Sequence, residues 1–154
     1  MTRDLLVAAA VVVALAALLV HRPSAEPSTV RADPTRTPGA LNPDVAQTNI
    51  NRTICVRGWT KTVRPPVEYT NALKVRQMRE YSEVGDRSGY QEDHLISLEL
   101  GGAPTDPRNL WPEPYPRAST VDTIENELNA KVCSGELSLA DAQRKESELK
   151  HSDG

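Results

Sequence analysis

The N-terminal third of the chain leaves only a short stretch from which a folded domain can form. Leu5 to Val20 is an uninterrupted run of sixteen apolar residues, preceded by a single arginine near the N-terminus. Residues 22–45 follow, with several prolines, many small polar residues and no hydrophobic periodicity. Such a segment buries too little apolar surface to fold, so we expect a disordered linker there. One small domain is therefore predicted, over residues 46–150.

The apolar run predicts export of the chain. It is longer than many signal-peptide cores and shorter than the roughly 20 residues that cross a bilayer comfortably. Pro23-Ser24-Ala25 places a proline where a signal peptidase needs a small residue. Residues 1–21 are thus either a cleaved signal peptide or an uncleaved membrane anchor. In either case the domain is expected outside the cytoplasm, secreted or in the cell envelope.

The domain has few large aromatic side chains, which makes a covalent crosslink valuable. The chain contains no Phe, two Trp and four Tyr. Cys55 and Cys133 are the only cysteines, and an even number in an exported chain favours a disulfide. Two free buried thiols are the alternative. No CxxC motif accompanies these cysteines, which argues against a metal site between them.

Hydrophobic patterning predicts an α+β domain. A strand is expected between residues 48 and 64, ending at Pro65-Pro66, and then a helix capped by Thr70 or Asn71. The segment 90–100 alternates as a strand, with His94, Ile96, Leu98 and Leu100 on one side. After a turn at residues 101–108, a second strand precedes two helices, which start near Ser119 or Thr120 and at Ser138.

His94 is the only histidine inside the predicted domain, and it follows Asp93 directly. A lone histidine on a strand is usually structural. Here a Gly101-Gly102 turn comes next, and Asn109 then precedes the second strand and the helix. This stretch, "EDHLISLELGGAPTDPRNLWP", together with "VDTIENELNAKVCSGEL", resembles the HNH nucleases, the ββα-metal or His-Me finger superfamily. The likeness covers about 45 of the 154 residues and extends to small exported bacterial proteins carrying an HNH-like module.

The resemblance implies a role for each motif residue. His94 would be the general base, Asp93 a metal ligand, and Asn109 the residue that hydrogen-bonds across the loop and holds the base. The third motif residue belongs on the following helix. This chain departs from the family there, because the spacing is longer and the helix carries no histidine.

Helix geometry suggests substitutes for that third residue. Val121, Ile124, Leu128 and Val132 form the expected apolar stripe. Glu125 and Asn129 are an i,i+4 pair beside this stripe, so we predict both as metal ligands. Asn126 lies on the opposite face of the helical wheel and is the reserve candidate.

These residue types suit metal-dependent phosphodiester hydrolysis. Neutral histidine can take a proton from water, and hard oxygen ligands favour Mg²⁺ as the cofactor. The net charge of −3 gives no overall attraction for nucleic acid, but basic side chains are candidate contacts to a DNA or RNA backbone: Arg57, Lys61, Arg64, Arg76 and Arg108.

The sequence therefore predicts an exported, metal-dependent endonuclease of low sequence specificity. Two alternatives stay open. One is a catalytically inactive HNH-fold module that binds polyanions or proteins, and the other is a purely structural domain of the cell envelope.

Overall fold

The computed structural model describes residues 31–153 and confirms the α+β class. The apolar run and residues 22–30 lie outside the described residues. The helices and strands, in chain order, are the 3₁₀ turn η1 (Gln47–Arg52), α2 (Trp59–Val63), α3 (Val67–Glu80), the 3₁₀ turn η2 (Arg87–Gly89), β1 (Tyr90–His94), the 3₁₀ turns η3 (Leu98–Leu100) and η4 (Pro107–Asn109), β2 (Leu110–Pro114), α4 (Arg117–Ser134) and α5 (Leu139–Ser152).

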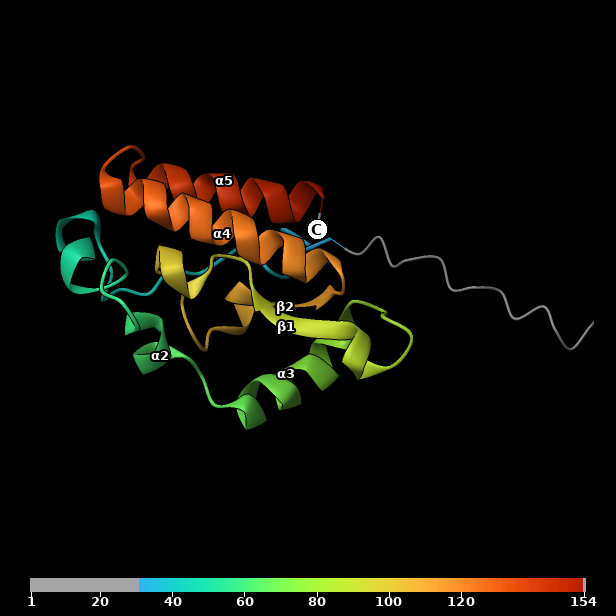
Figure 1. The fold of residues 1–154 in the computed structure, drawn as a ribbon. Coiled ribbons are helices and arrows are strands. Elements are labelled where there is room, and N and C mark those ends of the chain that lie inside the picture. The colour runs from blue at the N-terminus through green and yellow to red at the C-terminus, as the bar shows by residue number, and fades with distance from the viewer. Residues whose placement is uncertain (1–30, 154) are drawn as a thin grey trace, which may run out of the picture.

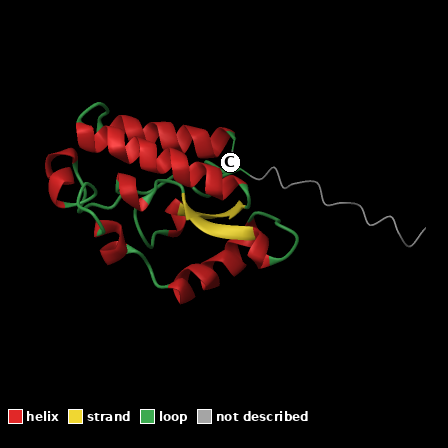
Figure 2. Cartoon of the chain, viewed as in Figure 1, coloured by secondary structure: helices red, strands yellow, loops and turns green. Residues whose placement is uncertain are grey.

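A two-stranded antiparallel hairpin lies between two layers of helices (Figure 1). The register pairs Tyr90 with Pro114 and His94 with Leu110. Helices α4 and α5 lie side by side on one side of the hairpin, and α3 covers the other (Figure 1). Outside this hairpin, residues 31–153 consist almost entirely of helices and loops, as Figure 2 shows.

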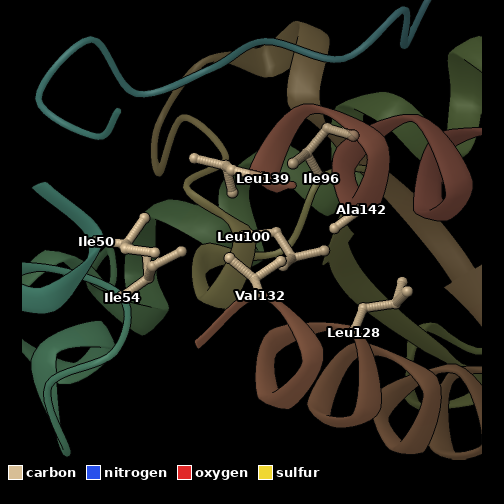
Figure 3. Close-up of a cluster of buried hydrophobic side chains, with 8 residues drawn as sticks. All are labelled: Ile50, Ile54, Ile96, Leu100, Leu128, Val132, Leu139 and Ala142. Atoms are coloured by element: carbon tan, nitrogen blue, oxygen red, sulfur yellow. The ribbon is translucent and has the colours of Figure 1, made fainter. Parts of the chain in front are cut away.

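The main hydrophobic core lies where α4 and α5 meet the loop after β1 (Figure 3). Leu128 and Val132 of α4 and Leu139 and Ala142 of α5 bury their side chains against that loop. The loop after β1 contributes Ile96 and Leu100 to this core. Ile50 of η1 and Ile54, in the turn that follows η1, complete it. The segment that directly follows His94 is therefore packed into the hydrophobic core.

The predicted strand between residues 48 and 64 is wrong, because this segment forms η1 and α2 instead. Its Thr, Ile and Val residues have strand propensity, but within residues 31–153 no neighbouring strand offers backbone partners. Ile50 and Ile54 lie four residues apart and both enter the core, as on a helical turn.

The predicted helices exist, with shifted starts. α3 begins at Val67 after Pro66, and α4 begins at Arg117 after Pro116, each earlier than the predicted caps. Neither start has a side-chain cap, and the pyrrolidine ring restricts φ of the N-cap residue at both. The Ser138 cap of α5 is confirmed, since its hydroxyl accepts from the Asp141 N–H at 3.1 Å.

The strand predicted over residues 90–100 ends at His94. Beyond it the chain folds back on itself, and the Gly102 N–H donates to the Ser97 carbonyl at 2.9 Å. Leu98 and Leu100 are nevertheless buried, because they belong to a 3₁₀ turn that points into the core. Alternating hydrophobicity here reflects a buried loop and not a longer strand.

Residues 31–45 pack against the domain, which corrects the linker prediction for this part of the segment. Ala32 and Thr37 are buried, and Leu41 bridges to Gly102. The backbone N–H groups of Gly39 and Asn42 donate to carbonyls of Arg108 and Gly101. Tertiary hydrogen bonds thus replace the apolar burial that this proline-rich segment lacks.

The structure contains the predicted disulfide between Cys55 and Cys133, whose Cα atoms are 5.6 Å apart. It links the segment before α2 to the last turn of α4. This bond indicates an oxidising environment outside the cytoplasm.

Candidate active site

His94 ends β1 with one ring nitrogen anchored. Its Nε2 lies 3.0 Å from the carbonyl oxygen of Pro104. A carbonyl can only accept, so Nε2 carries the proton in the neutral ring and Nδ1 has a free lone pair. Burial lowers the His94 pKa below its usual value, although the Pro104 bond opposes this. The ring is therefore neutral near pH 7 and able to accept a proton.

Asn109 holds the loop that positions His94. Its side chain is fully buried, accepts from the Ile96 N–H at 3.0 Å, and donates to the carbonyls of Ile96 and Ala103 at 3.0 and 3.1 Å. The Leu95 N–H donates to the Asn109 carbonyl at 2.8 Å. The geometry fits the predicted positioning role of Asn109, which does not line the cleft beside His94.

Gly102 makes this arrangement sterically possible. A Cβ at this position would lie 1.8 Å from the Ile96 carbonyl oxygen and 2.7 Å from Asn109 Nδ2. Only a residue without a side chain fits there. The hydrogen bonds of Asn109 to this loop thus require glycine at position 102, the second residue of the Gly-Gly turn.

A cleft of about 490 Å³ opens beside His94. Strand β1, the N-terminal part of α3 and the middle of α4 form its walls. Arg64 is the only arginine or lysine lining it within the part of the chain that the structure describes, whereas five acidic residues contribute: Glu92, Asp93, Glu99, Asp122 and Glu125.

A buried ammonium group lies behind this cleft. Lys150 of α5 is completely buried, and its Nζ lies 2.7 Å from Asp93 Oδ2 and 2.6 Å from Glu125 Oε1. It also donates to the His94 carbonyl at 2.5 Å and lies 3.4 Å from Glu146 Oε1. Burial alone would lower the Lys150 pKa, but Asp93, Glu146 and Glu125 raise it well above its ordinary value.

The carboxyl groups around Lys150 differ in protonation. Burial opposes ionisation of Asp93, yet the nearby charge of Lys150 holds the Asp93 pKa below its usual value. Burial raises the pKa of Glu113 and of Glu125 to about 9, with the Asp93 charge adding to both shifts. Burial likewise raises the Glu92 pKa to about 8. At neutral pH Asp93 is therefore the anion that balances Lys150, while Glu92, Glu113 and Glu125 are protonated.

The structure brings together only part of the predicted metal-ligand set. The carboxyl groups of Asp93 and Glu125 lie close to each other, but both contact the Lys150 ammonium. Asn129 points elsewhere and donates to the carbonyls of Glu99 and Ile54, at 2.8 and 3.3 Å. Asn126, the reserve candidate, does line the cleft. Within residues 31–153, no group of three or more Asp, Glu, His or Cys side chains is arranged to hold a metal ion.

Helix α4 is rotated slightly about its axis relative to the predicted apolar stripe. Ala118, Val121 and Glu125 are buried, whereas Ile124 is only half-buried. The carboxyl group of Glu125 enters the interior because the Lys150 ammonium lies there as its partner. Sequence periodicity cannot register a polar partner that is remote in the chain.

Lys150 and Glu146 are site residues that were not predicted from the sequence. A signal for them exists in α5, where the buried positions are Leu139, Ala142, Glu146 and Lys150. Two charged residues thus occupy an apolar stripe at helical spacing. Charged residues are almost never fully buried unless paired, so this pattern indicates an internal ion-pair site.

The predicted phosphate contacts fall into two groups. Arg64 lines the cleft, Arg57 lines a neighbouring pocket of about 300 Å³, and Lys61 lies between them on α2. These three exposed side chains form no ion pair within residues 31–153. Arg76 and Arg108 instead pair with Glu80 and Asp106, at 3.6 and 2.6 Å.

Comparison of the chain with protein families, curated proteins and solved structures found no match. Among the residues that the structure describes, no helix has the length and apolar character to cross a membrane.

Proposed function

We propose that this protein is an exported endonuclease that hydrolyses phosphodiester bonds, with His94 as the general base. The observation that carries the proposal is the anchored imidazole, which has a protonated Nε2, a free Nδ1 and a place at the wall of an open cleft. The resemblance of "DH…GG…NL" to HNH nucleases supports the same function.

The reaction requires a water, a base and charge stabilisation. His94 Nδ1 takes a proton from a water molecule as its oxygen attacks phosphorus. The Arg64 guanidinium can form paired hydrogen bonds to the phosphoryl oxygens and so stabilise their growing charge. The bond from phosphorus to the leaving oxygen breaks, and solvent in the open cleft protonates that oxygen.

Nucleic acid is the proposed substrate because basic side chains lead into the cleft. Arg57, Lys61 and Arg64 follow one another along and around α2. Contacts of this kind bind phosphates irrespective of base sequence. We therefore propose cleavage of DNA or RNA with low sequence specificity.

Mg²⁺ stays a prediction from the resemblance. The predicted ligands Asp93, Glu125 and Asn129 do not converge on one point, and two of them are bound to Lys150. No step of the proposed reaction is therefore assigned to a metal ion.

Export is proposed on the apolar run of residues 5–20 together with the disulfide. A reporter fused after residue 30 is expected to be active only outside the cytoplasm, and its size distinguishes a cleaved signal peptide from a membrane anchor. A soluble cytoplasmic fusion would contradict both versions.

Plasmid nicking by residues 31–154 tests the nuclease proposal, with Mg²⁺, Mn²⁺, Zn²⁺ or EDTA in parallel. His94→Ala should slow cleavage by at least about a hundredfold, the usual contribution of a general base. His151→Ala is the matched control, because His151 bonds the Thr37 carbonyl and does not line the cleft. Wild-type cleavage rates in a folded His94→Ala variant would refute the role of His94.

A nucleic-acid-binding module without catalysis is the second candidate. The contacts of Asp93 and Glu125 with Lys150 favour this candidate, because they occupy two carboxyl groups that a metal-dependent nuclease would use. Binding of DNA without cleavage under every metal condition, with affinity reduced by Arg64→Ala, would identify this function.

A further inference from the structure

Lys150 reaches the cleft wall from a distant part of the chain. It lies near the end of α5, 57 residues after Asp93 and 25 after Glu125. The buried face of α5 carries its ammonium between β1 and α4. Core packing of Leu139 and Ala142 at the other end of α5 keeps this helix in place.

The coordination of the ammonium is complete. An ammonium has three protons, and three oxygens lie within 2.7 Å of Nζ, from Asp93, Glu125 and the His94 backbone. Glu146 adds a further carboxylate, and both its oxygens also accept from the Ser97 N–H at 3.0 Å. With no exposed surface, Lys150 cannot reach a substrate in the cleft.

A divalent ion cannot share this place. Mg²⁺ needs oxygen ligands at roughly 2.0–2.1 Å in near-octahedral geometry. Nζ already lies between Asp93 Oδ2 and Glu125 Oε1, at hydrogen-bonding distance from each. A divalent ion beside a buried ammonium would also meet strong repulsion at low dielectric.

We infer that the Lys150 ammonium is the resident cation of this cleft, so that Asp93 and Glu125 bind no divalent metal in this protein. The inference goes beyond the proposed function, because it holds whether or not the chain cleaves nucleic acid. Where a divalent ion would orient Asp93 and the end of β1, Lys150 does so from inside the fold. Lys150 is thus a positioning residue for His94, acting through the His94 carbonyl and the Asp93 side chain.

The inference has a direct consequence for engineered variants. Replacing Lys150 by Met keeps a side chain of similar length but removes the charge. Asp93 and Glu125 then face each other with no cation between them. Such a pair, at the wall of an open cleft, should acquire affinity for a divalent ion.

Mn²⁺ binding followed by electron paramagnetic resonance tests this inference on residues 31–154. The wild type should show no saturable site that depends on Asp93 or Glu125 up to about millimolar Mn²⁺, the range of weak protein sites. Any Mn²⁺ binding that survives Asp93→Asn and Glu125→Gln lies elsewhere and agrees with the inference. A wild-type site abolished by Asp93→Asn would overturn it.

Lys150→Met should gain one Mn²⁺ site, at least about tenfold tighter than any wild-type binding, and Mn²⁺ should raise its melting temperature. Adding Glu125→Gln should remove the gain. Lys145→Met is the matched control, since Lys145 is exposed on the same helix and should leave Mn²⁺ binding unchanged. A folded Lys150→Met variant without the new site would overturn the inference.

If Lys150→Met fails to fold, the Mn²⁺ titration of the wild type still tests the inference. The double variant Lys150→Met, Glu146→Gln is the second choice, because it leaves less unbalanced negative charge inside the fold. The outcome is separate from that of plasmid nicking, because Mn²⁺ binding is measured without substrate. Nicking that persists in EDTA agrees with a resident ammonium, whereas absence of nicking bears only on the proposed function.

Discussion

Asn109 shows how one buried side chain can replace a strand partner. Its amide satisfies both the N–H and the carbonyl of Ile96, which have no neighbour in the two-stranded sheet. Unpaired buried backbone groups cost about 1–3 kcal/mol each, so these bonds stabilise the turn after His94. Their geometry depends on Gly102, because a Cβ there would lie 1.8 Å from the Ile96 carbonyl oxygen and 2.7 Å from Asn109 Nδ2.

Gly102→Ala is therefore expected to destabilise the domain strongly. The added methyl group collides with the Ile96 carbonyl and with Asn109, and neither can move without breaking buried hydrogen bonds. We expect a loss of about 3 kcal/mol or more in the free energy of unfolding, measured by urea denaturation. Gly89→Ala, where a Cβ meets open space, should be close to neutral. Equal effects of the two substitutions would contradict this account of the loop.

Glu113 makes stability depend on pH. Burial and the Asp93 charge raise its pKa in the folded state to about 9, against an ordinary value of 4.5. Between these values the folded protein holds a proton that the unfolded chain has lost, so the free energy of unfolding falls as pH rises from about 5 to 9. Glu125 and Glu92 act in the same direction.

Glu113→Gln should reduce this slope, because glutamine imitates the protonated carboxyl and does not titrate. At pH 5 the variant and the wild type should melt at similar temperatures. At pH 8 the variant should melt at least about 3 °C higher, as a gain of about 1 kcal/mol implies for a domain of this size. Thermal denaturation across pH 5–9 measures this difference in melting temperature. Parallel pH profiles of the two proteins would contradict the prediction, because they would mean that Glu113 is ionised in the folded protein.

At the scale of elements, α4 has two functions along its length. Its N-terminal half supplies Asp122 and Glu125 to the cleft, and its C-terminal half supplies Val132 to the core and Cys133 to the disulfide. The disulfide partner Cys55 lies between η1 and α2, which are short elements with few buried residues. Arg57, Lys61 and Arg64 belong to this same part of the chain.

Cys55→Ser combined with Cys133→Ser should therefore loosen α2 more than the hairpin. We expect a loss of about 2–4 kcal/mol in the free energy of unfolding, typical of disulfides that close long loops. Hydrogen exchange should show reduced protection first in residues 47–64, while β1 and β2 stay protected. Uniform loss of protection across the domain would instead mean that the disulfide stabilises the whole fold cooperatively.

At the scale of the molecule, the segment 31–45 completes the site from outside. The Ala32 N–H donates to the Lys150 carbonyl, and the Ala40 N–H donates weakly to Asn109 Oδ1 at 3.4 Å. The Ala103 N–H donates to the Ala40 carbonyl, on the loop that anchors His94. The segment thus contacts both the end of α5 and the loop behind the imidazole.

A chain beginning at residue 46 should consequently be less stable than one beginning at residue 31. It loses the backbone bonds to Gly101, Ala103, Arg108 and Lys150 and exposes the ring of Tyr81, whose hydroxyl lies 2.7 Å from Thr37 Oγ1. We expect a melting temperature at least about 5 °C lower, from the loss of one or two kcal/mol. A chain beginning at residue 31 is the control, and equal melting temperatures would show that the segment is dispensable.

The local features of this protein could be predicted from the order of its residues. A strand that carries Asp93-His94, the Gly-Gly turn, Asn109 before the second strand, the three long helices and the cysteine pair all follow from residue type and short-range spacing, whereas the end of the first strand at His94 does not. Each of these depends on neighbours within a few residues, or on a count of cysteines. Helix starts and the segment 48–64 were predicted less well, because local propensity does not show which backbone partners are available.

How the charged groups combine depends on contacts between distant parts of the chain. Lys150 meets Asp93 across 57 residues of sequence, and residues 31–45 bond to a loop more than 50 residues away. Hydrophobic periodicity predicts which face of a helix is buried, but not which charged side chain from another element lies against that face. The energy of a buried carboxylate depends on its partner cation, and that partner is specified by the packing of α5 on α4 and β1.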